Sequence, residues 1–258
     1  MIKTITLIGS GNVATHLGKA FLNQGVEINQ VYSYNKDNAF ELANQLNAMP
    51  CDEIKFISDE SDAYFICIKD DYIEDIAQQL SVKNKIVVHT SGSVPLQILN
   101  QFENHGIFYP LQTFSKEKDL DLTTVPFCIE ANNKKTKHAL LEFAKTLSNN
   151  VHEIDSEQRK KIHLAAVFAC NFSNYMYSIA EDILRQEHLN FEMLKPLILE
   201  TAKKTQENSP KAMQTGPAIR NDQEVIKEHI ELLNDSKKHQ EIYQLISHAI
   251  LNSSDISK

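Results

Sequence analysis

Isoleucine, leucine and threonine fill most of positions 2–8, and glycine interrupts this apolar pattern directly afterwards. From Val13 onward, apolar residues recur at three- and four-residue spacing, which predicts a helix. A near-continuous apolar run is typical of a parallel strand that is buried on both faces. The amino-terminal segment therefore predicts a buried strand, a glycine turn and a helix, in that order.

Short apolar runs and helical patterns then alternate to about residue 155. The runs predict strands over 26–34, 53–57, 63–68, 85–89, 106–109, 126–130 and 151–154, and the helical patterns lie over 38–46, 72–80, 94–100 and 134–147. Strands that alternate with helices predict a mostly parallel, doubly wound sheet of the Rossmann type. We therefore predict an α/β domain over residues 1–155.

The periodicity becomes helical throughout from residue 156. A long helix is expected to about Gln186, and a second over 190–208 that Pro196 bends or delays. A third helix follows Asn221 and Glu224, which have the spacing of a capping box, and a last one covers 239–252. Residues 156–258 are thus predicted to form an all-helical domain.

The glycine turn has the spacing of a dinucleotide-binding fingerprint. Gly9 makes the tight turn, Gly11 lets the backbone approach a pyrophosphate, and Ala14 allows the helix to pack closely on the strand. The helix that begins here directs free N–H groups toward the phosphates. The predicted cofactor-binding residues of this turn are Gly9, Ser10, Gly11, Asn12, Val13 and Ala14.

The end of the second predicted strand favours NADP over NAD. NAD-binding folds carry an acidic residue about 20 positions beyond the fingerprint, but this chain has Ser33, Asn35 and Lys36 there. A hydroxyl, an amide and a cation suit the 2′-phosphate of NADP. Alternatively, Lys36 could be a solvated loop residue, with Asp37 as the N-cap of the next helix.

Other strand ends are expected at the same edge of the sheet, where ligands bind in doubly wound folds. Candidates for the cofactor are Ile68, Lys69, Asp70, Thr90 and Ser91, and candidates for the substrate are Gln112 and Thr113. Ser91 is also a catalytic candidate, beside His89. Each group has a structural alternative, because Asp70 or Asp71 could cap a helix, and Ser93 could cap the helix after Gly92.

The first helix of the second domain carries the main catalytic candidate. His163 lies near its start, where the helix leaves the α/β domain, and an imidazole titrates near neutral pH. Asn171 and Asn174 follow on the same helix and are further candidates. In the later loop, Thr215 and Arg220 are candidates for the substrate. His163 could equally be a satisfied interface histidine, and Arg220 could pair with Asp222 or Glu224.

Composition narrows the class of protein. A formal charge of −8 excludes the basic surface that nucleic acid requires, and 42% apolar residues suffice for a core. The four cysteines lie far apart, which suits a reducing cytoplasm, and we assign no metal site. No run approaches the roughly 20 apolar residues of a membrane span, and the amino terminus lacks the features of a signal peptide. We expect a cytoplasmic protein with no membrane partner.

Taken together, these motifs resemble the superfamily of 6-phosphogluconate dehydrogenase, and the fingerprint is similar to that of pyrroline-5-carboxylate reductase. Over its whole length the chain resembles a family that joins a Rossmann-like domain to a helical domain of unknown function, DUF2520. The motifs that carry this resemblance are 89–92, 110–114, 163–171 and 215–222. Relatives often have histidine where this chain has Tyr109. The resemblance implies a homodimer formed through the helical domain, and catalytic residues on its first helix.

Three functions are compatible with the sequence. The first is an NADP-dependent reductase or dehydrogenase that acts on a small anionic metabolite, in which the nicotinamide carries the hydride. The second is a redox-inactive protein that binds NADP as a sensor or structural ligand. The third is a dimerisation scaffold that has lost the cofactor, which the intact fingerprint disfavours.

Overall fold

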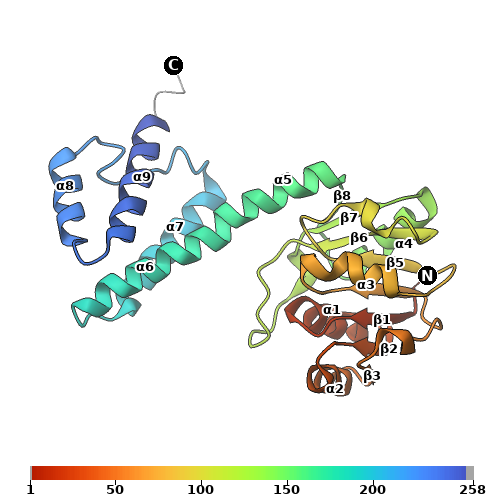
Figure 1. Cartoon of the computed structure of the whole chain (residues 1–258). Coiled ribbons are helices and arrows are strands. Elements are labelled where there is room, and N and C mark those ends of the chain that lie inside the picture. The colour runs from red at the N-terminus through yellow and green to blue at the C-terminus, as the bar shows by residue number, and fades with distance from the viewer. Residues whose placement is uncertain (1, 254–258) are drawn as a thin grey trace. The chain divides into compact units, whose positions relative to one another are not determined.

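The computed structural model describes residues 2–253, and its contacts divide the chain into two compact units. The first unit ends at Asn171 and the second begins at Phe172. Within the described residues, the first unit holds an eight-stranded sheet in the order β3-β2-β1-β4-β5-β6-β7-β8 (Figure 1). The neighbouring strands are parallel except for β6 and β7. The predicted α/β fold with a mostly parallel sheet is therefore confirmed.

The strands of this sheet are short. Their bounds are β1 Thr4–Ile8, β2 Glu27–Tyr32, β3 Met49–Cys51, β4 Ala63–Ile66, β5 Ile86–His89, β6 Asn104–Pro110, β7 Phe127–Ala131 and β8 Val151–Glu153. The helices of the first unit are α1 Asn12–Asn23, α2 Lys36–Gln45, α3 Ile73–Gln79, α4 Lys134–Lys145 and α5 Ser156–Ala166. The division by contacts thus lies beyond residue 155, because α5 packs on the sheet through contacts described below.

Alternating side chains of the central strands supply a core on each face of the sheet. On β4, Phe65 packs with residues of α1, α2 and α4, whereas Tyr64 and Ile66 pack with α3 on the other face. The first face contains a group of five phenylalanine rings in mutual contact: Phe21, Phe65, Phe108, Phe127 and Phe143. Burial on both faces explains why the strands read as continuous apolar runs.

Two predicted elements of the first unit are wrong. The strand expected over 53–57 is β3, which lies earlier and contains Pro50, and a short 3₁₀ turn, Ile54–Phe56, follows it. Proline is tolerated here because β3 is an edge strand. The helix expected over 94–100 is only the 3₁₀ turn Leu96–Leu99, since Pro95 has an extended backbone.

The long predicted helix is interrupted. α5 passes into a π-helical segment, Val167–Phe172, and then into α6, Ser173–Gln186. The wider π turn changes the helical register. Asn171 lies inside this segment and Asn174 beyond it, so neither residue continues the regular helical spacing from His163 that a single long helix would have given.

The second unit is helical. After α6 come the 3₁₀ turn Phe191–Leu194, α7 Lys195–Glu207, α8 Gln223–Leu232 and α9 Lys237–Ser253. Pro196 lies in the first turn of α7, so it delays the helix as predicted. The predicted capping box is wrong, because Asp222 caps α8 and Asn221 has a φ of 55°. No helix among the described residues has the length and apolar character to cross a membrane.

Candidate active site

The switch point of the sheet lies at β1, which pairs with β2 on one side and β4 on the other. Gly9 follows β1 with a φ of +126°, and its N–H donates to the carbonyl oxygen of Tyr32 at 2.8 Å. A Cβ atom at Gly9 would lie 2.2 Å from the carbonyl oxygen of Cys67, at the end of β4. Only glycine fits this crossing, where doubly wound sheets bind their ligands.

The start of α1 is open to an anion. No side chain caps the helix, its first turn holds no acidic residue, and a Cβ atom at Gly11 would meet nothing within 4 Å. Ala14 is fully buried in the core, as close packing of helix on strand requires. The Asn12 side chain instead donates to the carbonyl oxygen of Phe114 at 2.8 Å, which ties the loop after β6 to this helix. The remaining N–H groups suit a pyrophosphate.

The end of β2 holds the residues predicted to select NADP. The Ser33 hydroxyl is buried and accepts a hydrogen bond from Ser10 at 2.9 Å, which links this strand end to the fingerprint turn. Asn35 caps α2 through the N–H of Asn38, so the alternative in which Asp37 is the N-cap is wrong. The Lys36 side chain is 83% exposed, with Asp52 4.0 Å away. An exposed ammonium here can pair with a phosphate.

The end of β4 lies beside the end of β1, at the same edge of the sheet. Asp70 accepts a hydrogen bond from the hydroxyl of Ser93, while no side chain caps α3. The helix-cap alternatives for Asp70, Asp71 and Ser93 are therefore wrong: Asp70 and Ser93 connect the loops after β4 and β5. Lys69 is exposed beside them, and Ile68 packs near Gly9.

The end of β5 is built around a neutral histidine. His89 is fully buried, and its Nδ1 accepts from the N–H of Ser91 at 3.2 Å. Burial lowers the pKa of His89 to about 3, so this imidazole is uncharged at neutral pH. The Ser91 hydroxyl oxygen accepts from the N–H groups of Ser93 and Val94, at 3.1 and 3.0 Å, and Thr90 bonds back to β4. Ser91 thus shapes this turn.

His163 lies against the ends of β5 and β6. Its Nδ1 is 2.9 Å from the hydroxyl oxygen of Tyr109, and the two rings meet edge to face. A Cβ atom at Gly92 would lie 2.6 Å from that Nδ1 and 2.8 Å from Cζ of Tyr109. Glycine is required because the loop after β5 runs directly over the pair. Tyr109 was not among the sequence candidates, since its contact with His163 exists only in the folded chain.

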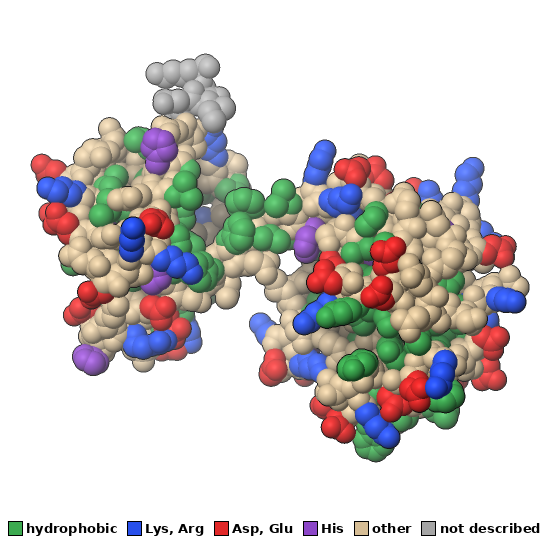
Figure 2. Space-filling view, in the orientation of Figure 1, with side chains coloured by type: hydrophobic (Ala, Val, Ile, Leu, Met, Phe, Trp, Pro, Cys, Tyr) green, Lys and Arg blue, Asp and Glu red, His purple; other side chains and the backbone are tan. Residues whose placement is uncertain are grey.

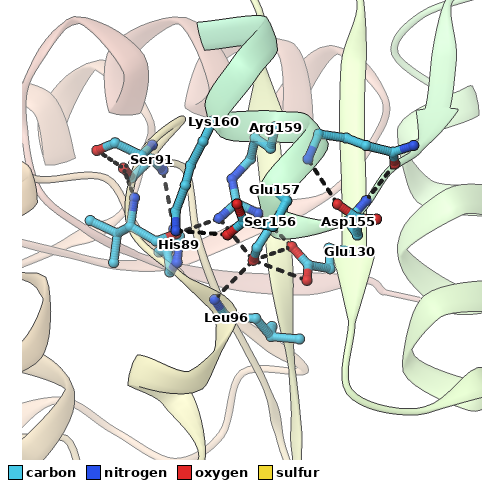
Figure 3. Close-up of polar contacts among 12 residues, drawn as sticks. His89, Ser91, Leu96, Glu130, Asp155, Ser156, Glu157, Arg159 and Lys160 are labelled. Carbon is cyan, nitrogen blue, oxygen red and sulfur yellow. Dashed lines mark hydrogen bonds and ion pairs between the residues drawn. The ribbon is translucent and has the colours of Figure 1, made fainter. Parts of the chain in front are cut away.

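Arg159, which was not among the sequence candidates, anchors α5. Its side chain has no exposed surface, and its Nη1 lies 2.5 Å from Oε2 of Glu130 on β7 (Figure 3). Its Nη2 donates to the carbonyl oxygen of Val94, and Ser156 donates to Glu130. This network holds the first turn of α5, one helical turn before His163, against the loop after β5. Its position in a predicted helix does not distinguish it from a solvated basic residue.

The remaining candidates are exposed. The amide oxygen of Gln112 accepts from the backbone N–H of Thr113 at 2.8 Å. Thr215 and Arg220 belong to the second unit, and within the described residues Arg220 forms no ion pair with Asp222 or Glu224. The roles assigned to Thr215, Arg220, Asn171 and Asn174 stay predictions. No group of three or more potential metal ligands is found in the part of the chain that the structure describes.

Two family models match the chain. Residues 4–92 match a family described as NADP oxidoreductase, coenzyme F420-dependent, and residues 125–250 match the domain of unknown function DUF2520. A solved protein of Bacteroides fragilis, provisionally named an NADP oxidoreductase, is 41% identical over 97% of this chain and 98% of its own, with a TM-score of 0.92. The chain belongs to the DUF2520 family. The description of the family that residues 4–92 match names NADP, in agreement with the cofactor predicted from the sequence.

More distant structures share the fold of this DUF2520 protein. The pyrroline-5-carboxylate reductase of Coxiella burnetii is 17% identical over all of both chains, with a TM-score of 0.59. A reductive aminase of Aspergillus terreus, solved with NADPH and ethyl-5-oxohexanoate, is 12% identical over 100% of this chain and 95% of its own, with a TM-score of 0.70. None of the curated proteins matches the chain.

Proposed function

We propose that this protein is an NADP-dependent reductase or dehydrogenase that acts on a small anionic metabolite. The observation that carries the proposal is the contact at the switch point, where Gly9 fits against Cys67 beneath an uncapped helix. A Cβ atom at Gly9 would collide with backbone there, while Gly11 faces open space. Together they form a turn through which a pyrophosphate can reach the N–H groups of α1.

The rest of the cofactor would follow the row of strand ends. Toward β2, Ser33 and Lys36 would hold the ribose and its 2′-phosphate. In the other direction, the end of β5 lies two strand spacings from β1, roughly 10 Å. The nicotinamide would therefore lie beside Ser91 and Gly92, close to His163. When bound, the cofactor supplies a hydride, and the protein must position it and manage one proton.

His163 is the residue that we assign to the proton. Its Nδ1 is engaged by Tyr109, and within the described residues no hydrogen bond involves Nε2. Nε2 is thus the ring nitrogen left for a substrate. Donation of a proton to the developing charge contributes typically 10²–10⁴-fold to a rate. His89 is unsuited to this role, because its ring is fully buried and its Nδ1 is taken by the N–H of Ser91.

The proposed charge of the substrate rests on exposed cations. Lys69 is exposed shortly after β4. Arg220 has no ion pair within the described residues, so its guanidinium is available to bind a carboxylate. Both side chains are available to an anion.

We also propose a homodimer formed through the helical unit. Among the described residues of that unit, only one hydrophobic residue, Ala218, is buried. Figure 2 shows apolar side chains on the surface of the unit. Large hydrophobic residues are exposed there, among them Met193, Leu197, Leu199, Leu232 and Leu245. Exposed apolar surface on this scale marks an interaction site. Light scattering should give twice the chain mass, and a monomer would contradict this proposal.

The test of function is turnover. Purified protein should bind NADPH more tightly than NADH and should oxidise NADPH with a member of a panel of keto acids, other ketones, aldehydes and cyclic imines. The variant His163→Ala should bind NADPH normally and turn over at least 100-fold more slowly, an estimate from the usual contribution of a proton donor, about 10²-fold or more. Tight NADPH binding without any oxidation would instead favour the redox-inactive sensor.

A further inference from the structure

Tyr109 lies near the end of β6 and is in direct contact with His163. It is buried, with 8% of its surface exposed, and its hydroxyl oxygen is 2.9 Å from Nδ1 of His163. The ionisable groups that act on this hydroxyl come from three other elements: Cys128 on β7, Arg159 and His163 on α5, and Asp70 after β4. The phenol is therefore enclosed, and its partner is the proposed catalytic imidazole.

The position of the hydroxyl hydrogen follows from burial. Burial raises the pKa of Tyr109 to about 12, so the phenol keeps its hydrogen at neutral pH. Within the described residues, Nδ1 of His163 is the acceptor that lies within hydrogen-bond distance. Donation to Nδ1 requires that this nitrogen carry a lone pair. A neutral His163 must then carry its own hydrogen on Nε2.

We propose that Tyr109 is the source of the proton that His163 delivers, and that the group reduced in the substrate is the carbonyl of a ketone or aldehyde. This inference rests on the proposed oxidoreductase function. The hydride from the reduced cofactor forms a bond to the carbonyl carbon, and the π electron pair moves to the carbonyl oxygen. That oxygen takes the hydrogen of Nε2, while Nδ1 takes the hydrogen of Tyr109. The products are an alcohol, the oxidised cofactor and a tyrosinate, which regains a proton from water.

Two features support this relay. An alkoxide is a stronger base than a tyrosinate, so proton transfer toward the substrate is downhill. Burial raises the pKa of Tyr109, and Arg159, which is buried one helical turn before His163, offsets part of that rise and so favours the tyrosinate. Tyr109 thus acts through His163 rather than on the substrate itself.

The same hydrogen placement selects the substrate class. An Nε2–H group donates a hydrogen bond, and a carbonyl oxygen accepts one. An iminium ion already carries hydrogen on its nitrogen and needs an acceptor, which this tautomer of His163 does not present. The pair therefore favours ketones and aldehydes over iminium substrates.

The experiment compares Tyr109→Phe with Tyr64→Phe. Tyr64 is a matched control, because it too is buried, has a pKa raised to about 12 and donates one hydrogen bond, to the carbonyl oxygen of Ser58 at 2.6 Å. In wild type and in Tyr64→Phe, kcat for carbonyl reduction should stay level from about pH 7 to about pH 9, because the phenol remains protonated. In Tyr109→Phe, kcat should fall about 100-fold and decline further as pH rises, since an imidazolium must then supply the proton.

The histidine tautomer is read independently of turnover, from the ¹⁵N shifts of the imidazole in the full chain. Wild type should show His163 with Nε2 protonated and Nδ1 unprotonated, and Tyr109→Phe should lose this preference. A protonated Nδ1 in wild type, or a level pH profile with wild-type kcat in Tyr109→Phe, would overturn the relay while the reductase assignment stands. Absence of NADPH oxidation with every substrate would overturn the proposed function and the relay together.

Discussion

Alanine at position 92 would place a methyl group inside the contact between the loop after β5 and the Tyr109–His163 pair. The Cβ atom would lie 2.6 Å from Nδ1 of His163, 2.7 Å from its Cγ and 2.8 Å from Cζ of Tyr109. Gly92 does not have a positive φ, so its backbone conformation is open to alanine. The substitution therefore tests the contact itself and not backbone strain.

The size of the effect follows from these distances. Ordinary contacts of a Cβ atom begin at 3.4 Å, so the imidazole must move by about 0.8 Å, the difference from 2.6 Å. A shift of that size directed away from Tyr109 would stretch their 2.9 Å hydrogen bond beyond bonding distance. Misplacement of about 1 Å can cost 10²-fold in rate, and overpacking costs about 1–3 kcal/mol of stability. We expect kcat of Gly92→Ala to fall about 100-fold.

The assay measures kcat and the NADPH dissociation constant in parallel. Gly92→Ala should keep its affinity for NADPH, because the pyrophosphate turn lies at the end of β1. The matched control is Gly11→Ala, whose Cβ atom would meet nothing in the protein, so this variant should fold normally and lose NADPH affinity. A folded Gly92→Ala protein with wild-type kcat would refute the assignment of the His163 site.

Four further changes test other parts of the account. Gly11→Asp should abolish NADPH binding in a folded protein, since a carboxylate would confront the pyrophosphate; unchanged affinity would exclude that turn. Lys36→Ala should weaken NADPH but not NADH, and equal losses would remove the 2′-phosphate assignment. Arg159→Met should lower the free energy of unfolding by about 3–5 kcal/mol in a urea titration, because Glu130 loses its buried partner, and a loss below about 1 kcal/mol would contradict the anchor. His89 binds a proton in the unfolded chain below about pH 6.5 but in the folded chain only near pH 3. The free energy of unfolding should therefore decrease as the pH is lowered from about 6.5 to about 3. His89→Gln should flatten this fall by up to about 2 kcal/mol at about pH 5, and an unchanged slope would refute the burial argument.

The fingerprint and the sheet could be predicted because their signals are local. Glycine spacing after an apolar run identifies the turn at Gly9, and strands buried on both faces are recognisable from composition alone. His163 could be placed near the edge of the sheet because the change from α/β to helical periodicity fixes where α5 begins. These inferences need no knowledge of which side chains meet.

Other parts of the site depend on contacts that sequence does not encode locally. Arg159 resembles any solvated basic residue on a helix, and its partners Glu130 and Val94 are 29 and 65 positions away. The pairing of Tyr109 with His163 spans 54 positions. The π segment likewise changes the register of the helix without a proline or glycine to mark it.

A crystal structure with bound NADP⁺ would test the central claim most directly. The account predicts the pyrophosphate on the N–H groups at the start of α1, the 2′-phosphate beside Lys36, and the nicotinamide over the end of β5 with its C4 atom on the side of His163. A nucleotide bound elsewhere, or a nicotinamide ring turned away from the Tyr109–His163 pair, would contradict it.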